Sequence, residues 1–409
     1  MFFDLPPAGF LHKAFVGARA WTREKSTPRP IRQPSIPIAL GKVQVPGKTF
    51  DGFTLVMAAS MSAPSTQAFL LDMRGDRVHT WSIPFSDVWP DPPHVQGFTK
   101  DSRVCFFGSH LYANGDLLVV FHGLNNEANG YGLAKLDKDS KVIWKYAANI
   151  HHDVDVGEDG AIYAVKHANV TELPRGLDFL PIPSLVDYLV QLSPDGKELE
   201  PPISILEAFQ HSPYSSLLSS RIGMPPGTPG FHGLDNGDIL HTNCVRVLKR
   251  DLAGKFPMLK AGQVLISVRQ LDTIAALDIK KRAVVWAVRG PWRAQHDSQF
   301  LDNGHLLLFD NLGSTRGSRV LEFDPQSQAI SWSYVSEDSP SFVSSERGMC
   351  QRLPNGNTLI VDSEGGKMLE VTHDKKLVWT CFCRGFITTA RRYDPNYLQF
   401  LKGEQRARP

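Results

Sequence analysis

The sequence lacks long apolar runs and paired cysteine motifs, and both gaps exclude classes of protein. No stretch approaches the roughly 18 apolar residues that a membrane-spanning helix needs, and the chain does not open with a basic segment followed by an apolar one. The five cysteines have no CxxC spacing, and their odd number argues against a full disulfide framework. We therefore expect no membrane span, no visible signal peptide and mostly buried thiols.

An excess of charge of one sign is also missing, since 44 Lys and Arg residues nearly balance 42 Asp and Glu residues and leave a net charge of +2. No basic run is interleaved with aromatic residues, so the pattern of a nucleic-acid-binding protein is absent. No Walker-type glycine-rich loop is present either, which speaks against a nucleotide donor. We expect neither a nucleic-acid partner nor a cofactor.

What the chain does contain is a degenerate repeat built on hairpin turns. Turn pairs of the Asn-Gly or Asp-Gly type precede β-rich runs, and each unit tends to end in Trp. The turns end at Gly115, Gly160, Gly304 and Gly356, and the tryptophans are Trp81, Trp144, Trp286, Trp332 and Trp379. The last two Trp intervals are 332 − 286 = 46 and 379 − 332 = 47 residues. Such a period is the size of a four-stranded propeller blade, and counting from Phe53 predicts an all-β, six-bladed β-propeller.

The extent of the repeat divides the chain into three predicted segments. Residues 1–48 are predicted to be an N-terminal arm or linker, 49–384 the propeller, and 385–409 a solvated basic C-terminal tail. Residues 205–230 contain a short amphipathic helical pattern followed by a Pro-rich stretch, and we expect a helical insertion that forms a lid over the channel mouth. The alternative is a surface helix packed on the side of a blade.

Polar residues recur at fixed distances from the turn glycines. His152 and His296 each lie eight residues before a turn glycine, and His241 precedes a similar strand in blade four, where about 13 residues are inserted. A second set, seven residues after the glycines, comprises His122, His167, Arg269, Asn311 and Ser363. Because the first two strands of each blade are innermost, His152, His241, Arg269 and His296 are predicted to converge on one channel mouth.

Such a cluster has two interpretations. Repeated histidines also tie strands together through hydrogen bonds, but an Arg among several buried histidines favours an anionic ligand. Arginine and imidazolium groups hold the oxygens of an anion, while a neutral imidazole can attack its central atom. Sulfuryl transfer fits this set of side chains.

At these residues the sequence resembles the bacterial arylsulfotransferase family, propeller enzymes that move sulfate between phenols without a nucleotide. The resemblance rests on short motifs across most of the chain, among them His151-His-Asp-Val-Asp-Val, His241-Thr-Asn, Ser267-Val-Arg-Gln, Gln295-His-Asp and Leu308-Phe-Asp-Asn. It implies an aryl sulfate donor, a phenol acceptor, a ping-pong mechanism and, where a leader has been removed, a periplasmic location.

The resemblance also implies site residues. His296 matches the histidine that becomes transiently sulfated, and His241 and Arg269 match residues that bind sulfate oxygens and steady the transition state. In the His-Asp motif the register favours His152 over His151. The expected catalytic residues are thus His296, His241, Arg269 and His152, and the expected substrate-binding residues are Asn243, His151, Asn311 and His167.

Two other classes of function remain open. One is a propeller that binds an anionic small molecule or a protein without chemistry, which a fold cannot exclude. The other is a different propeller enzyme, such as a quinone-dependent dehydrogenase or a metal-dependent lactonase. The registered positions carry no ring of carboxylates, so we expect no metal site.

Overall fold

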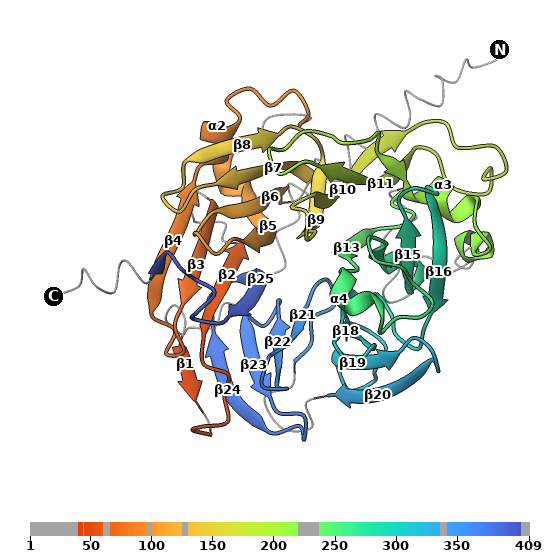
Figure 1. Cartoon of the computed structure of the whole chain (residues 1–409). Helices are drawn as coiled ribbons and strands as arrows, with labels where there is room; N and C mark the ends of the chain where they lie inside the picture. The colour runs from red at the N-terminus through yellow and green to blue at the C-terminus, as the bar shows by residue number, and fades with distance from the viewer. Residues whose placement is uncertain are drawn as a thin grey trace, which may run out of the picture. The chain divides into compact units, whose positions relative to one another are not determined.

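The computed structural model describes residues 40–43, 45–59, 66–95, 100–124, 130–219, 237–335 and 342–401. The unit that begins at Pro37 consists mainly of antiparallel strands arranged as six blades around a centre (Figure 1). Its α-helices within the described ranges are short: α2 (Phe85–Val88), α3 (Ile205–Gln210) and α4 (Arg250–Ala253). None of them is long and apolar enough to cross a membrane. The six-bladed β-propeller is confirmed.

Each blade has four strands, which follow one another from the innermost to the outermost. Blade 1 contains β25 (Phe386–Tyr393), β2 (Phe53–Ala59), β3 (Thr66–Leu71) and β4 (Arg77–Ile83). Blade 2 contains β5 (Val104–Leu111), β6 (Leu117–Gly123), β7 (Gly130–Leu136) and β8 (Val142–Tyr146). Blade 3 contains β9 (Ile150–Val156), β10 (Ile162–Val170), β11 (Ser184–Leu192) and β12 (Ile203–Ser204).

The remaining blades follow the same order. Blade 4 contains β13 (Thr242–Val247), β14 (Val264–Val268), β15 (Thr273–Asp278) and β16 (Ala283–Arg289). Blade 5 contains β17 (His296–Phe300), β18 (Leu306–Asp310), β19 (Arg319–Asp324) and β20 (Ala329–Tyr334). Blade 6 contains β21 (Met349–Arg352), β22 (Thr358–Asp362), β23 (Lys367–Val371) and β24 (Leu377–Phe382), with β1 (Leu40–Val43) added outside β24.

The repeated turns and tryptophans both have a structural reason. Gly115 and Gly304 adopt φ of 91° and 86°, a left-handed conformation that favours glycine, in the turns between the two inner strands. The indole N–H of Trp81 donates to the carbonyl of Gly115, and that of Trp332 donates to the carbonyl of His373. In both cases the acceptor belongs to a turn of the next blade. The repeated Trp therefore fastens neighbouring blades, and buried apolar residues fill the space between them.

The propeller extends beyond both predicted boundaries of 49 and 384. Strand β25, from the predicted tail, pairs with β2 and supplies the innermost strand of blade 1, while β1 pairs with β24. Arg391 and Arg392 are therefore not solvated. Their side chains project to opposite faces of β25, and each makes its own contacts with the protein. Arg392 forms a fully buried ion pair with Glu370. Residues 386–393 thus close the ring instead of leaving it.

The expected lid helix lies elsewhere. Helix α3 begins after Ser204, whose side chain accepts a hydrogen bond from the backbone N–H of Glu207. Its apolar face packs against β11 and β12 of blade 3 and β16 of blade 4, which are outer strands (Figure 1). The described part of the predicted lid, up to residue 219, is thus a helix on the outer side of two blades, and the lid interpretation is wrong for it. Residues 220–230 of that segment lie outside the described residues.

Candidate functional site

Bulges in the innermost strands aim the polar side chains of the centre. The pairing between β9 and β10 shifts where His152 and Asp153 intervene, and that between β13 and β14 shifts at Asn243. His152 and His241 both adopt positive φ, of 58° and 51°. Left-handed residues and bulges redirect side chains out of the regular alternation of a strand. The sequence thereby brings consecutive polar residues to the same side of the sheet.

His296 begins β17 and is held in one orientation. It is 2% exposed, and its Nδ1 lies 2.9 Å from Oδ1 of Asn311 and 3.1 Å from the carbonyl oxygen of Ala294. The amide nitrogen of Asn311 donates to the carbonyls of Ser344 and Arg347, so its oxygen must face His296. Two acceptors therefore hold the proton on Nδ1. The lone pair is left on Nε2, which has no hydrogen-bond partner within the described part of the chain.

The electrostatics of the centre keep this imidazole neutral. Burial lowers the pKa of His296 well below its ordinary value, and the positive charge of Arg269 lowers it further. Burial also lowers the pKa of His122 to about 3, followed by the effect of Arg347. His296 is thus a neutral nitrogen base surrounded by guanidinium groups, an arrangement suited to an anion.

A small cavity opens beside His296 at the centre of the ring. Residues from the inner strands, or just before them, of all six blades line it: Ser109, Asp153, Asn243, Arg246, His296, Asp297, Arg347, Gly348, Met349, Thr389 and Arg391. The side chain of Asn243 donates to the carbonyl of Gln295 at 2.9 Å and so ties blade 4 to blade 5 next to His296. The cavity therefore combines a neutral imidazole with amide and guanidinium donors.

Arg347 was not predicted from the sequence. It is buried, its Nε donates to the carbonyl of Thr388, and its guanidinium lies 3.7 Å from the centre of the Phe107 ring. Burial lowers the pKa of Arg347 to about 10. No ion pair of its guanidinium with a carboxylate is found within the described residues. The signal in the sequence was its position one residue before Gly348, which lies eight residues before the turn glycine Gly356.

Asp238 positions His241. Oδ2 of Asp238 accepts from Nδ1 of His241 at 2.5 Å, and Oδ1 accepts from the His241 backbone N–H at 3.1 Å. Burial alone would raise the pKa of Asp238, but His241, His151 and Arg269 outweigh it, so the pKa is lowered and the carboxylate stays charged. This dyad orients the other nitrogen of His241, as in acid and base catalysis. The sequence showed no pattern that singled out Asp238.

His152 joins this dyad to the rest of the cluster. Its ring centre lies 4.8 Å from that of His241 and 5.5 Å from that of Phe107, and burial followed by His241 lowers its pKa well below the ordinary value. Arg269 follows β14 in a short 3-10 helix (Arg269–Leu271), and its backbone N–H donates to the carbonyl of His241. After burial, Arg269 and His241 also lower the pKa of His296, and the ring of His152 lies next to that of His241. The convergence of all four side chains on one channel mouth stays a prediction.

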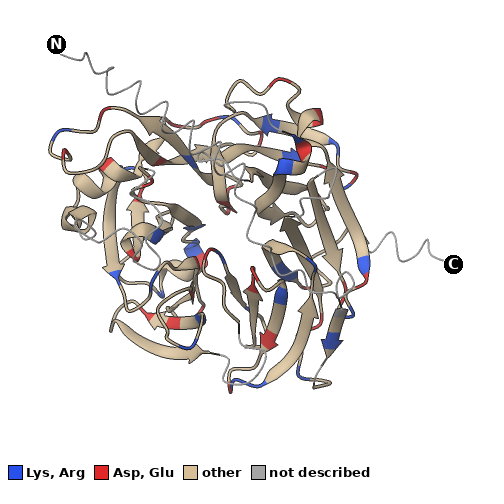
Figure 2. Cartoon of the chain, turned by 180° about the vertical axis from the view of Figure 1, so that it is seen from behind, with Lys and Arg blue, Asp and Glu red and all other residues tan. Residues whose placement is uncertain are grey.

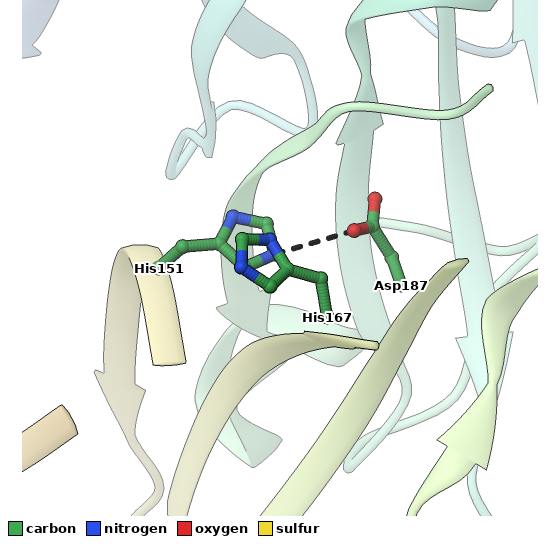
Figure 3. Close-up of side chains that lie close together, drawn as sticks. All are labelled: His151, His167 and Asp187. Atoms are coloured by element: carbon green, nitrogen blue, oxygen red, sulfur yellow. Dashed lines mark ion pairs between the residues drawn. The ribbon is translucent and has the colours of Figure 1, made fainter. Parts of the chain in front are cut away.

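Of the residues expected to bind substrate, Asn243 and Asn311 lie beside His296, whereas His151 and His167 lie further along blade 3. Their rings stack with centres 4.5 Å apart and face Asp187 (Figure 3). The register also needs a correction. His151 pairs with Val165 (160 + 5) and His296 with Phe309 (304 + 5), so His151, not His152, is the strand equivalent of His296. Two residues of the inner strand are unpaired in both bulges, but Leu308 of β18 is unpaired as well, so the register shifts by two residues in blade 3 and by one in blade 5.

Charged residues of both signs also border the middle of the ring (Figure 2). Arg246 bridges Asp153 and Asp297, and Arg391 makes a second ion pair with Asp297. The backbone N–H of Cys350 donates to Asp297 as well. Two guanidinium groups and two carboxylates thus neutralise one another beside the cavity.

Comparison with known proteins gives a family match and likenesses to solved structures. Residues 109–384 match the arylsulfotransferase (ASST) family. No curated protein is similar enough in sequence to match the chain. A solved protein of unknown function from Bacteroides caccae is similar at 12% identity, with 84% of this chain and 99% of that chain covered and a TM-score of 0.50.

A second solved structure is that of virginiamycin B lyase from Staphylococcus aureus, at 10% identity and a TM-score of 0.38, with 67% of this chain and 69% of that chain covered. At such identities a likeness concerns the fold alone. The family match is more informative, since it spans 384 − 109 + 1 = 276 of the 409 residues. The chain therefore belongs to the arylsulfotransferase family.

Proposed function

We propose that this protein transfers a sulfuryl group from an aryl sulfate ester to a phenol, through a sulfated His296. The observation that carries the proposal is the geometry of His296: its Nδ1 faces the side-chain oxygen of Asn311, and its Nε2 has no partner among the described residues, in a cavity that also contains Arg347 and Asn243. A neutral imidazole is a nucleophile, and the guanidinium groups around it favour an anionic substrate.

In the first half-reaction Nε2 of His296 attacks the sulfur of the donor. The N–S bond forms as the bond between sulfur and the aryl oxygen breaks, and the phenolate leaves with the electron pair. Arg269 and Arg347 stabilise the charge on the peripheral sulfuryl oxygens, which carry most of it in the transition state. Asn311 and Ala294 continue to accept the Nδ1 proton of the sulfated ring.

In the second half-reaction the oxygen of the acceptor phenol attacks the same sulfur. The O–S bond forms, the N–S bond breaks, and His296 regains its lone pair. The phenol proton passes to His241, which Asp238 orients, or to the adjacent His152. Since the first phenolate needs a proton on leaving, the same group serves in both directions.

The test is turnover of 4-nitrophenyl sulfate with and without added phenol. We expect release of nitrophenol to depend on the acceptor, and intact-mass spectrometry after donor treatment to show a chain heavier by one SO₃. In His296→Asn, which keeps hydrogen bonding but removes the nucleophile, both signals should vanish. His373→Asn is the matched control, because His373 is an exposed histidine of blade 6. Donor binding without label or turnover in the wild type would leave only a binding function.

A further inference from the structure

Blade 3 carries a second polar cluster that the proposed reaction does not use. His151, His167 and Asp187 lie on β9, β10 and β11, three neighbouring strands (Figure 3). His167 and Asp187 are direct partners across the ladder, and His151 pairs with Val165, two residues from His167. Direct partners and residues two apart share a face of a sheet, so all three side chains project from the same face of blade 3.

The ligand atoms of this cluster are close together and incompletely satisfied. One nitrogen or oxygen from each residue lies within 4.8 Å of the others, and the residues are 2%, 7% and 1% exposed. Nε2 of His151 lies 3.3 Å from Oδ1 of Asp187, but neither this Nε2 nor that of His167 makes a hydrogen bond within the described residues. Buried imidazole nitrogens without a partner are costly unless something absent from the protein's own hydrogen bonding satisfies them.

The surroundings already hold the other polar atoms of two of these side chains, Asp187 and His151. Oδ2 of Asp187 accepts from the backbone N–H of Thr242 at 2.7 Å, which leaves Oδ1 for another partner. Nδ1 of His151 lies 2.7 Å from Nδ1 of His152, so a proton on the His151 nitrogen has an acceptor and Nε2 keeps its lone pair. Ligating histidines commonly donate their second N–H in this way, and ligating carboxylates are hydrogen-bonded in turn.

We propose that His151, His167 and Asp187 bind one divalent transition-metal ion, with Zn²⁺ the best match. Two imidazole nitrogens and one carboxylate oxygen form a ligand set that zinc uses, and a fourth position is left for water. A single ion would satisfy Nε2 of both histidines and Oδ1 of the aspartate together. His151 and His167, expected from the sequence to contact substrate, are thereby assigned to a site beside the sulfuryl-transfer cluster.

The experiment measures metal uptake and is independent of transfer activity. Full-length protein, purified without a histidine tag and stripped with a chelator, is titrated with Zn²⁺ by calorimetry, and its metal content is measured by mass spectrometry. We expect one ion per chain, and affinity at least about a hundredfold lower in His167→Gln and Asp187→Asn. Asp187→Asn keeps an oxygen for the Thr242 N–H and so guards against misfolding of the other variant.

His122→Gln is the matched control, because His122 occupies the corresponding place in blade 2 (115 + 7, as 167 is 160 + 7) and is equally buried. It should bind Zn²⁺ as the wild type does. No uptake by the stripped wild type would overturn the proposal and leave a buried water as the group between the three side chains. Equal uptake by all variants would overturn it too, since the ion would then lie elsewhere. Zinc binding without sulfuryl transfer would support this site while refuting the proposed function.

Discussion

Replacement of Asn311 by Asp should move the acid limb of the transfer rate toward higher pH. In the wild type, burial and Arg269 lower the pKa of His296, so the nucleophile stays neutral well below the ordinary histidine pKa. The rate, as far as His296 governs it, should therefore persist into acid. A carboxylate in place of the Asn311 oxygen, 2.9 Å from Nδ1, stabilises the imidazolium and raises that pKa.

The size of the effect follows from the geometry. An opposite charge at such a distance should move the acid limb upward by about one to three pH units. Asn311→Asp also removes the only donor found for the carbonyl of Arg347 among the described residues, whereas the carbonyl of Ser344 keeps Ser318 Oγ. One orphaned carbonyl costs about 1–3 kcal/mol of the free energy of unfolding, which the fold should tolerate.

The assay is kcat/KM for 4-nitrophenyl sulfate, with phenol present, from acid to alkaline pH. Asn311→Ala serves as the second variant, because the carbonyl of Ala294 still accepts from Nδ1 and no charge is added. It should lose a few-fold to about tenfold in rate at all pH values, as one neutral hydrogen bond of about 0.5–1.5 kcal/mol predicts. An acid limb that stays in place in a folded Asn311→Asp protein would refute attack by a neutral His296.

Three further outcomes are expected. Arg347→Met should lower kcat by about 10²- to 10³-fold with little change in melting temperature, because a donor to the transition-state charge is lost; an unchanged kcat would remove Arg347 from the site. Asp238→Asn should slow the step that transfers the acceptor proton, so rates measured with phenols of rising pKa should fall more steeply than in the wild type, and parallel slopes would contradict the role of His241. Glu370→Gln should reduce the free energy of unfolding in urea by about 3–5 kcal/mol, because Arg392 is left buried without its carboxylate. A loss below about 1 kcal/mol would show that Glu370 is not the main partner of the Arg392 guanidinium.

The blade count could be predicted from the sequence because its signals are local. A turn glycine, the two strands around it and a terminal Trp recur within about 45 residues, and each has a direct structural role, as the bond from Trp81 to the carbonyl of Gly115 shows. Acidic and apolar residues likewise alternate along 153–156, as in a strand, and these residues belong to β9. Patterns contained within one blade can therefore be recognised in the sequence itself.

Contacts between distant segments could not be read in this way. Arg391 and Arg392 look like part of a solvated basic tail until Asp297 and Glu370 are placed beside them. The apolar face of the helix after Ser204 could cover a channel mouth or the side of a blade. Its contact with the outer strand β16 in the structure shows that it covers the side of the blades. The sequence indicates that the apolar face of this helix must be buried, but it does not show which strands bury it.

The site was predicted in outline and missed in detail. The spacing from turn glycines found His152, His296 and Arg269, because equivalent strand positions of successive blades meet at the centre. It could not find Asp238, which acts through His241. A register shift that is one residue larger in blade 3 than in blade 5 made His152 look equivalent to His296. Of the three proposed metal ligands, the sequence singled out His151 and His167, but as substrate-binding residues. Asp187 comes from a third strand with no spacing in common with them, so no metal-binding motif was visible.

The closing strand has a consequence for synthesis. Residue 59 ends β2 and residue 386 begins its partner β25, so 386 − 59 = 327 residues are added after β2 before the first residue of β25 is in place. At a translation rate of about 5–20 residues per second, blade 1 waits about 16–65 s on the ribosome with its innermost edge uncovered. An exposed edge of this kind invites pairing with other chains. Synthesis of blade 1 thus begins before that of the other five blades but ends after it. The open edge of β2 has to be kept from pairing with other chains until β25 has been synthesised.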